Sequence, residues 1–316
     1  MRVLLTSTHR YPAEDGKGSG IQPREEPSSA PAHINDLLAR GLAELGHEVL
    51  YCLPDGCDQP LPPGVQWIAE PRFDVDILHD LPNTSRPWVK TQHRTAGAAE
   101  ARDNWIFVSQ SLARVHRRTR FVYNGLDPAD YCYSQSKDDY FLYISGGQGN
   151  RIRHNYMAKG MDIALRLSAE LGFRLVVAGT ARQGFVVNRM MEMCRRYGAE
   201  FVGDVRGQRK AELFAGARAL IFPTRLFEGM PLVLIEALMS GTPVICSDRG
   251  PCPEIIIPGT GFACRDKQQY VDAVSRIGTI SPHRCRERAI QEFHYLKMAE
   301  GYAREYEAEL SGGNFM

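Results

Sequence analysis

Residues 219–246 read ALIFPTRLFEGMPLVLIEALMSGTPVIC, and this stretch decides the fold. Residues 219–222 form an apolar run with the length of a buried strand, and a second such run follows at 242–246. Between them, residues 231–240 have the pattern of a helix, with a proline at its start and Gly241 at its end. A strand, a helix and a second strand in this order predict a βαβ unit with parallel strands.

The same alternation extends in both directions along the 316-residue chain. We expect further strands at 2–6, 48–53, 65–69, 75–79, 88–91, 105–108, 120–123, 140–145, 174–178 and 200–202. We expect helices at 32–45, 161–171, 187–197 and 210–215, and a helical tail over 282–310. A polar and aromatic stretch without periodicity separates two similar halves near residue 130. The pattern predicts an α/β protein of two Rossmann-like domains, 1–130 and 138–295, with a ligand cleft between them.

Composition narrows the class of protein. Apolar residues make up 43% and charged residues 24%, which is typical of globular domains and excludes disordered and fibrous proteins. The formal net charge of +1 gives no support for a nucleic-acid partner. The eight cysteines include no Cys-x-x-Cys pair or zinc-ligand spacing, and Met1-Arg2 leads directly into an apolar strand. We therefore expect a reduced, cytoplasmic protein that has no secretory leader, no membrane span and no bound metal.

The strongest functional signal is the stretch FEGMPLVLIEA, which directly follows the strand at 219–222. Glu228 lies in the loop, and Gly229 allows close approach of a ligand to the backbone. The backbone N–H groups near Met230 and Leu232 begin the helix and can bind an anion or sugar hydroxyls. Glu236, one turn into the helix, can accept hydrogen bonds from a ribose diol. The alternative is that both glutamates are solvated helix charges.

Further residues decide between these alternatives. Glu228 and Glu236 form a Glu-x7-Glu pair, and Ala237 is followed by Gly-Thr-Pro-Val-Ile at 241–245. The motifs FVGDV at 201–205, ARALIFP at 217–223, PEII at 253–256 and GF at 261–262 accompany it in order. This set, from about residue 202 to 262, resembles the family-4 retaining glycosyltransferases. The resemblance implies the GT-B fold, in which two Rossmann-like domains have parallel sheets that face each other across a cleft.

The resemblance also implies roles for individual residues. Glu228 is expected to contact the donor sugar and Glu236 the ribose hydroxyls, with donor-sugar backbone contacts falling on Gly229, Met230 and Pro231. Pro231 has no N–H, so an amide contact at this point must come from a neighbour such as Leu232.

The diphosphate is expected to be held by cations. In the family, the diphosphate is bound by an arginine just after the first strand of the second domain and by a lysine in a Lys-Gly pair. Lys159-Gly160 matches the Lys-Gly pair. The arginine departs from the family pattern, because Gly146 and Gly147 open a longer loop and Arg151 and Arg153 come later. Either arginine can reach back to the phosphate, and the pattern does not distinguish them.

The N-terminal domain is expected to bind the acceptor. His93 matches the strand-end histidine that faces the donor sugar in the family, and His79 is a weaker candidate for the acceptor side. Gly18 and Gly20 lie where the family has a loop that meets the donor phosphate or the acceptor. The final helix, at about 296–316, is expected to pack back on this domain.

The predicted activity is transfer of a sugar from a nucleotide-diphosphate sugar, of which a UDP-sugar is the commonest in the family, to an acceptor hydroxyl with retention of configuration. The family needs no metal and no other cofactor. The acceptor stays open between a small sugar, a lipid-linked glycan, a natural product and a nucleic-acid base. A basic cluster at 114–120 leaves a peripheral position at a membrane open. The alternatives are a nucleotide-sugar-binding module without turnover and a nucleotide-sugar epimerase of the same architecture.

Overall fold

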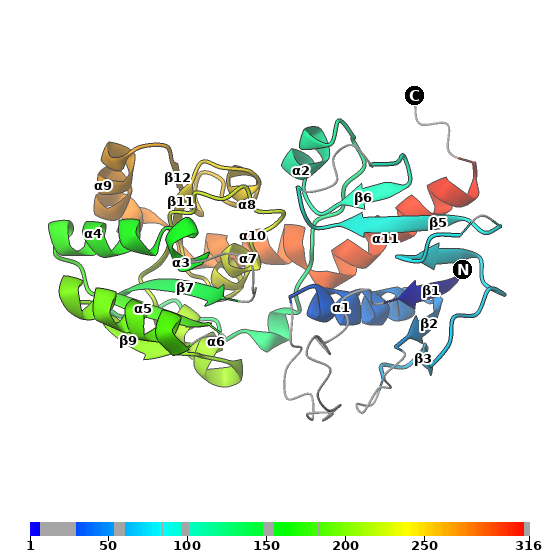
Figure 1. Cartoon of the computed structure of the whole chain (residues 1–316), viewed down its shortest axis with the longest axis horizontal. Coiled ribbons are helices and arrows are strands. Elements are labelled where there is room, and N and C mark those ends of the chain that lie inside the picture. The colour runs from blue at the N-terminus through cyan, green and yellow to red at the C-terminus, as the bar shows by residue number, and fades with distance from the viewer. Residues whose placement is uncertain are drawn as a thin grey trace. The chain divides into compact units, whose positions relative to one another are not determined.

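The computed structural model describes residues 1–6, 30–53, 61–83, 85–95, 101–147, 155–181 and 184–312. The chain divides into two compact units. Unit 1 comprises residues 1–127 and 292–316, and unit 2 comprises residues 128–291. Figure 1 shows strands and helices alternating along the chain in each unit.

Unit 1 contains a six-stranded parallel sheet in the order β3-β2-β1-β4-β5-β6. Its strands are β1 (Arg2–Thr6), β2 (Glu48–Cys52), β3 (Val65–Ile68), β4 (Ile77–His79), β5 (Trp88–Gln92) and β6 (Trp105–Phe107). Its helices are α1 (Ala30–Glu44), α2 (Gln110–Val115) and α11 (Tyr295–Leu310). Helix α11, red in Figure 1, contacts α1 and β5, so the C-terminal segment completes the core of the N-terminal sheet.

Unit 2 repeats the arrangement with the order β12-β11-β10-β7-β8-β9, again with every pair parallel. Its strands are β7 (Phe141–Gly147), β8 (Leu175–Ala181), β9 (Glu200–Gly203), β10 (Ala219–Phe222), β11 (Val244–Ser247) and β12 (Gly261–Cys264). Its helices are α3 (Asn155–Ala158), α4 (Met161–Leu171), α5 (Gly184–Tyr197), α6 (Gly207–Gly216), α7 (Leu232–Met239), α8 (Cys252–Ile255), α9 (Lys267–Arg276) and most of α10 (Pro282–Phe293). The 3₁₀ turns are η2 (Pro128–Asp130) and η3 (Ile277–Thr279).

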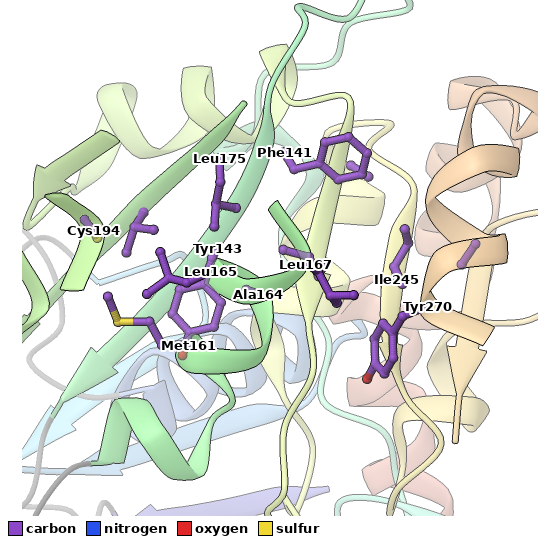
Figure 2. Packing of buried hydrophobic residues seen from close by; sticks show 14 of the residues in the cluster. Phe141, Tyr143, Met161, Ala164, Leu165, Leu167, Leu175, Cys194, Ile245 and Tyr270 are labelled. Atoms are coloured by element: carbon purple, nitrogen blue, oxygen red, sulfur yellow. The ribbon is translucent and has the colours of Figure 1, made fainter. Parts of the chain in front are cut away.

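The core of unit 2 forms where the apolar stripes of its helices meet one face of the sheet (Figure 2). Tyr143 of β7 is fully buried against Met161 and Leu165 of α4, and Leu175 of β8 and Ile245 of β11 belong to the same cluster. Burying a large apolar side chain contributes about 1.5–3 kcal/mol. The cluster therefore holds the strands of the sheet in place behind the loops at their carboxyl ends.

Both sheets have one topology. Counting unit 2 from β7, each order becomes 3-2-1-4-5-6, which is the Rossmann arrangement. This confirms the predicted α/β class with two parallel, Rossmann-like sheets. In this arrangement, ligands bind outside the carboxyl ends of the strands where the order reverses, which in unit 2 is the point between β7 and β10.

Two predicted elements differ from the structure. The strand expected at 120–123 makes only a single bridge, between Phe121 and Phe107. The expected helical tail is two helices, because His294 has an extended backbone, caps α11 through its ring, and pairs with Leu126. This break at His294 separates α10 from α11.

Candidate active site

The segment that follows β10 is bent by its own hydrogen bonds. The hydroxyl of Thr224 accepts a hydrogen bond from the N–H of Leu226 at 3.1 Å, and its carbonyl accepts one from the hydroxyl of Ser247 at 2.5 Å. Thr224 is buried, so the turn is held between the ends of β10 and β11. The chain therefore reaches Glu228 at the carboxyl edge of the sheet, where ligands bind in this fold.

Lys159 and Glu228 lie together at this edge. Nζ of Lys159 is 3.7 Å from Oε1 of Glu228, and the two side chains are 22% and 20% exposed. Oε1 of Glu228 is buried and has no hydrogen-bond partner among the residues that the structure describes. The two groups attract each other, but the carboxylate oxygen keeps its capacity to accept a hydrogen bond from a ligand.

Gly160 allows the approach of Lys159 to the sheet. Its φ of +82° lies in the left-handed region, and a Cβ built on it would lie 2.0 Å from the carbonyl oxygen of Pro223. Only glycine fits both conditions. The turn between α3 and α4, which carries Lys159, is thereby packed directly on the end of β10.

Glu236 lies on α7 and is 8% exposed. Its Oε1 accepts hydrogen bonds from Nζ of Lys210 at 2.7 Å and from the hydroxyl of Tyr131 at 3.4 Å. Its Oε2 is buried and has no partner within the described part of the chain. Because a buried carboxylate oxygen without a donor costs free energy, it is a natural position for a ligand hydroxyl.

The N-terminus of α7 supplies backbone donors close to these carboxylates. The helix begins at Leu232, and its N-cap Pro231 makes no side-chain cap. The first N–H groups of a helix have no partner inside the helix, and the helix dipole favours negative charge there. Gly229 and the buried Met230 precede the helix, so the stretch predicted to contact the donor sugar is continuous with this N-terminus.

The sequence pattern predicted a loop at Gly146 and Gly147, but in the structure they are the last two residues of β7. They pair with Thr180 and Ala181 of β8, because the hydrogen bonds between parallel strands are made by backbone groups and need no side chain at a glycine. Their contact with the donor stays a prediction. Four further predicted residues, Gly18, Gly20, Arg151 and Arg153, lie outside the described residues.

In unit 1, His79 is fully buried at the end of β4. Its Nδ1 is 2.5 Å from the hydroxyl of Tyr306, and its Nε2 is 2.7 Å from the hydroxyl of Thr91. Burial, assisted by the charge of His93, lowers the pKa of His79 to about 3. The ring is therefore neutral and joins α11 to the sheet, and it has no exposed surface for the acceptor contact that the sequence suggested.

Asp80 follows His79 with a φ of +60° and is also buried. Its Oδ1 accepts a hydrogen bond from the N–H of Thr91 at 2.8 Å, and its Oδ2 is 3.8 Å from Nε2 of His79. Burial raises the pKa of Asp80 to about 7. His93 follows β5 in the same unit and is half-buried, and its role at the donor sugar stays a prediction.

Sequence reasoning missed the residues that surround the predicted carboxylates and lysine. Lys210 and Tyr131 hold Glu236, while Arg225 and Asp162 hold the turn that carries Lys159. No motif marks them. Their contacts span 26 to 105 residues along the chain and exist only because the sheet brings α4, α6 and α7 to one edge.

The arrangement in unit 2 places a cation, two carboxylates and a helix N-terminus at the carboxyl edge of one sheet. Such a set can bind a diphosphate, a sugar and a ribose diol. In the described ranges, no group of three or more His, Cys, Asp or Glu side chains is placed to hold a metal ion. No helix in those ranges is long and apolar enough to cross a bilayer.

Comparison with known proteins defines the class. Residues 139–279 match the family model described as Glycosyl transferases group 1. The match lies in unit 2 and contains Lys159, Glu228 and Glu236. It confirms the family that the motifs indicated.

Individual relatives agree with this class. The chain is 22% identical over 185 residues to the O-antigen chain mannosyltransferase RfbU of Salmonella typhimurium, a match that covers 54% of this chain and 51% of the relative. The chain thus matches about half the length of that protein. AviGT4, a glycosyltransferase involved in avilamycin A biosynthesis, superposes with a TM-score of 0.77 at 23% identity, over 99% of this chain and 98% of AviGT4.

HepE of Anabaena, solved in complex with UDP and glucose, superposes with a TM-score of 0.64 at 15% identity, over 98% of this chain and all of HepE. At these identities, the solved structures show the fold alone. That fold is the two-Rossmann GT-B fold expected from the sequence.

Proposed function

We propose that the protein is a retaining glycosyltransferase that uses a nucleotide-diphosphate sugar, with UDP as the nucleotide. The observation that carries the proposal is the grouping of Lys159 and Glu228, 3.7 Å apart, with the buried Glu236 on the adjacent helix α7. The match of residues 139–279 to the group 1 family model and the UDP bound to the fold relative HepE support it.

Each group has a role that its surroundings suit. Oε2 of Glu236 accepts a hydrogen bond from a ribose hydroxyl, since it is buried without a partner among the described side chains. The donor sugar lies against Glu228 and the backbone of Gly229 and Met230. The ammonium of Lys159 and the N-terminus of α7 stabilise the negative charge that grows on the leaving phosphate.

The reaction breaks the bond between the anomeric carbon and the phosphate oxygen and forms a bond from that carbon to the acceptor oxygen. The acceptor attacks on the face from which the phosphate leaves, which retains the configuration. The proton of the acceptor hydroxyl passes to the leaving phosphate oxygen. No protein base is required for this transfer, and His93 is proposed to contact the donor sugar from unit 1.

A thermal-shift screen against UDP-, GDP- and ADP-sugars, with and without EDTA, tests the donor site. A donor at about 100 times its Kd stabilises a protein by about 2.7 kcal/mol. We expect this stabilisation with the UDP-sugar, unchanged by EDTA and lost in Glu236→Ala. The matched control is Glu170→Ala, which removes an exposed glutamate that pairs with Lys267.

Product analysis then tests turnover. Incubation with the stabilising donor and a panel of acceptors, followed by NMR of the product, should show the anomeric configuration of the donor. An inverted product would contradict retention. Stabilisation by the donor without transfer or hydrolysis would favour a nucleotide-sugar-binding module, and epimerised sugar without an acceptor would favour an epimerase.

A further inference from the structure

Arg225 joins the two segments that carry Lys159 and Glu228. It directly follows the turn at Thr224, three residues before Glu228. Its backbone N–H donates to the carbonyl of Ala158 at 2.8 Å, and its Nη1 donates to the carbonyl of Met157 at 2.6 Å. Both acceptors lie immediately before Lys159, so Arg225 fixes the turn from one side.

The same guanidinium also reaches the other side of the turn. Nη1 and Nη2 of Arg225 donate to Oδ1 and Oδ2 of Asp162 at 2.7 and 2.8 Å, a two-point contact with the first turn of α4. The Asp162 side chain is 7% exposed. Burial alone would raise the pKa of Asp162, but the hydrogen bonds and charge of Arg225 outweigh it, and the pKa is lowered. Asp162 is therefore an ionised anchor for Arg225.

Lys159 lies between these contacts. On the N-terminal side of Lys159, the carbonyls of residues 157 and 158 accept hydrogen bonds from Arg225. On the C-terminal side of Lys159, the carboxylate of Asp162 accepts hydrogen bonds from Arg225. Gly160 packs on the carbonyl of Pro223, two residues before Arg225. Every one of these contacts links the turn of Lys159 to the segment of Glu228.

We infer that Arg225 is a positioning residue that acts through Lys159. It sets the place of the ammonium beside Glu228, and so beside the leaving phosphate of the donor, without touching the substrate itself. The inference rests on the proposed function, because it assumes that Lys159 binds the diphosphate. Misplacing a catalytic group by about 1 Å can lower a rate about 100-fold.

The test compares Arg225→Lys with Arg166→Ala. Lysine keeps a positive charge next to Asp162 but cannot make the two-point contact and the Met157 contact together. Arg166 is the matched control, because it also pairs with Asp162, at 3.5 Å, but is 61% exposed and donates to no carbonyl of the turn among the residues that the structure describes. We expect Arg225→Lys to lower kcat/KM for the donor about 10- to 100-fold. Arg166→Ala should behave as wild type.

A double-mutant cycle separates positioning from a general structural effect. In a Lys159→Ala background, Arg225→Lys should change kcat/KM by less than about twofold, because the group that it positions is gone. A wild-type kcat/KM in Arg225→Lys overturns the inference. An equal fall in kcat/KM with and without Lys159 overturns it as well.

A binding measurement tests this inference separately from the proposed function. UDP should stabilise the wild-type protein more than UMP, and this preference should be lost in Lys159→Ala and in Arg225→Lys but kept in Arg166→Ala. If wild type transfers no sugar, the proposed function fails and this preference still decides the role of Arg225. A preference retained in Arg225→Lys, or independent of Lys159, overturns the inference.

Discussion

Nζ of Lys210 lies 2.7 Å from Oε1 of Glu236 and donates a hydrogen bond to this one oxygen of a buried carboxylate. The pair holds the charge of Glu236 next to a cation, and the hydroxyl of Tyr131 shares the same oxygen. The other oxygen, Oε2, is buried without a hydrogen-bond partner in the described part of the chain, so it can still accept a hydrogen bond from a ligand. Because the two oxygens have different partners, the proposed contact with the ribose can be tested.

Replacement of Glu236 by glutamine should weaken UDP binding and spare the fold. The amide keeps the volume of the side chain but loses the charge that accepts the ribose hydroxyls. A hydrogen bond to a charged group contributes about 1.5–3 kcal/mol, so the Kd of UDP should rise about 10- to 100-fold. Isothermal titration of UDP against wild type and Glu236→Gln measures it.

The matched ligand for this measurement is 2′,3′-dideoxy-UDP, which has no ribose diol. It should bind wild type and Glu236→Gln with similar affinity, because the interaction that the substitution removes is absent in both cases. A similar loss for both ligands would place Glu236 elsewhere than at the ribose.

The sheet and most of its helices could be predicted because their patterns are local. The helix expected at 161–171 is α4 with the same bounds, since an apolar stripe is flanked by Gly160 and Gly172, both with positive φ. Helix α9 was missed, although Asp266 caps it by accepting a hydrogen bond from the N–H of Gln269 at 3.0 Å. Its stripe is short and polar residues dominate its sequence, so the periodic signal is weak.

The candidate site could be predicted only where a motif names its residues. Glu228, Glu236 and Lys159 stand in recognisable motifs, and their roles stay predictions. Arg225 and Lys210 read as ordinary surface charges, because nothing local shows that their partners lie on other elements. Likewise, His79 ends a strand, as a site residue does, but α11 comes from more than 200 residues further along the chain to bury it. Contacts of this kind depend on the fold and leave no sequence signal.

Gly160→Ala should destabilise unit 2 and abolish activity. Gly172→Ala should have a smaller effect on both. Both glycines have positive φ, +82° and +72°, and they flank the same helix. The left-handed backbone costs an alanine about 1–2 kcal/mol at either position. Only at Gly160 does the new Cβ also meet a carbonyl, 2.0 Å away, while Gly172 has nothing within 4 Å.

We therefore expect Gly160→Ala to lower the free energy of unfolding by about 2 kcal/mol more than Gly172→Ala, from the added overpacking. Urea unfolding followed by circular dichroism compares the two variants. Equal losses would mean that the turn of Lys159 can move away from β10 at little cost, which contradicts the close packing described above.

The buried pair His79 and Asp80 predicts an unusual pH dependence of stability. His79 has a pKa of about 3 in the fold, below its ordinary value of 6.5, so between these values the unfolded state binds the extra proton. Its contribution therefore makes stability rise with pH from about 3 to 6.5. Asp80 has a pKa of about 7 in the fold, above its ordinary 3.8, so the folded state keeps a proton that the unfolded state releases. Its contribution makes stability fall with pH from about 3.8 to 7.

The two contributions oppose each other between about pH 4 and 6.5, so the pair adds almost no slope in wild type. Single substitutions should expose each slope. In Asp80→Asn, stability should rise with pH across this window by as much as about 1.4 kcal/mol per unit relative to wild type. Asparagine suits the test because it tolerates the φ of +60° and can still accept the hydrogen bond from Thr91. In His79→Gln, stability should instead fall with pH across this window relative to wild type. Urea unfolding at several pH values measures both, and parallel curves for all three proteins would mean that neither group keeps its neutral form in the fold.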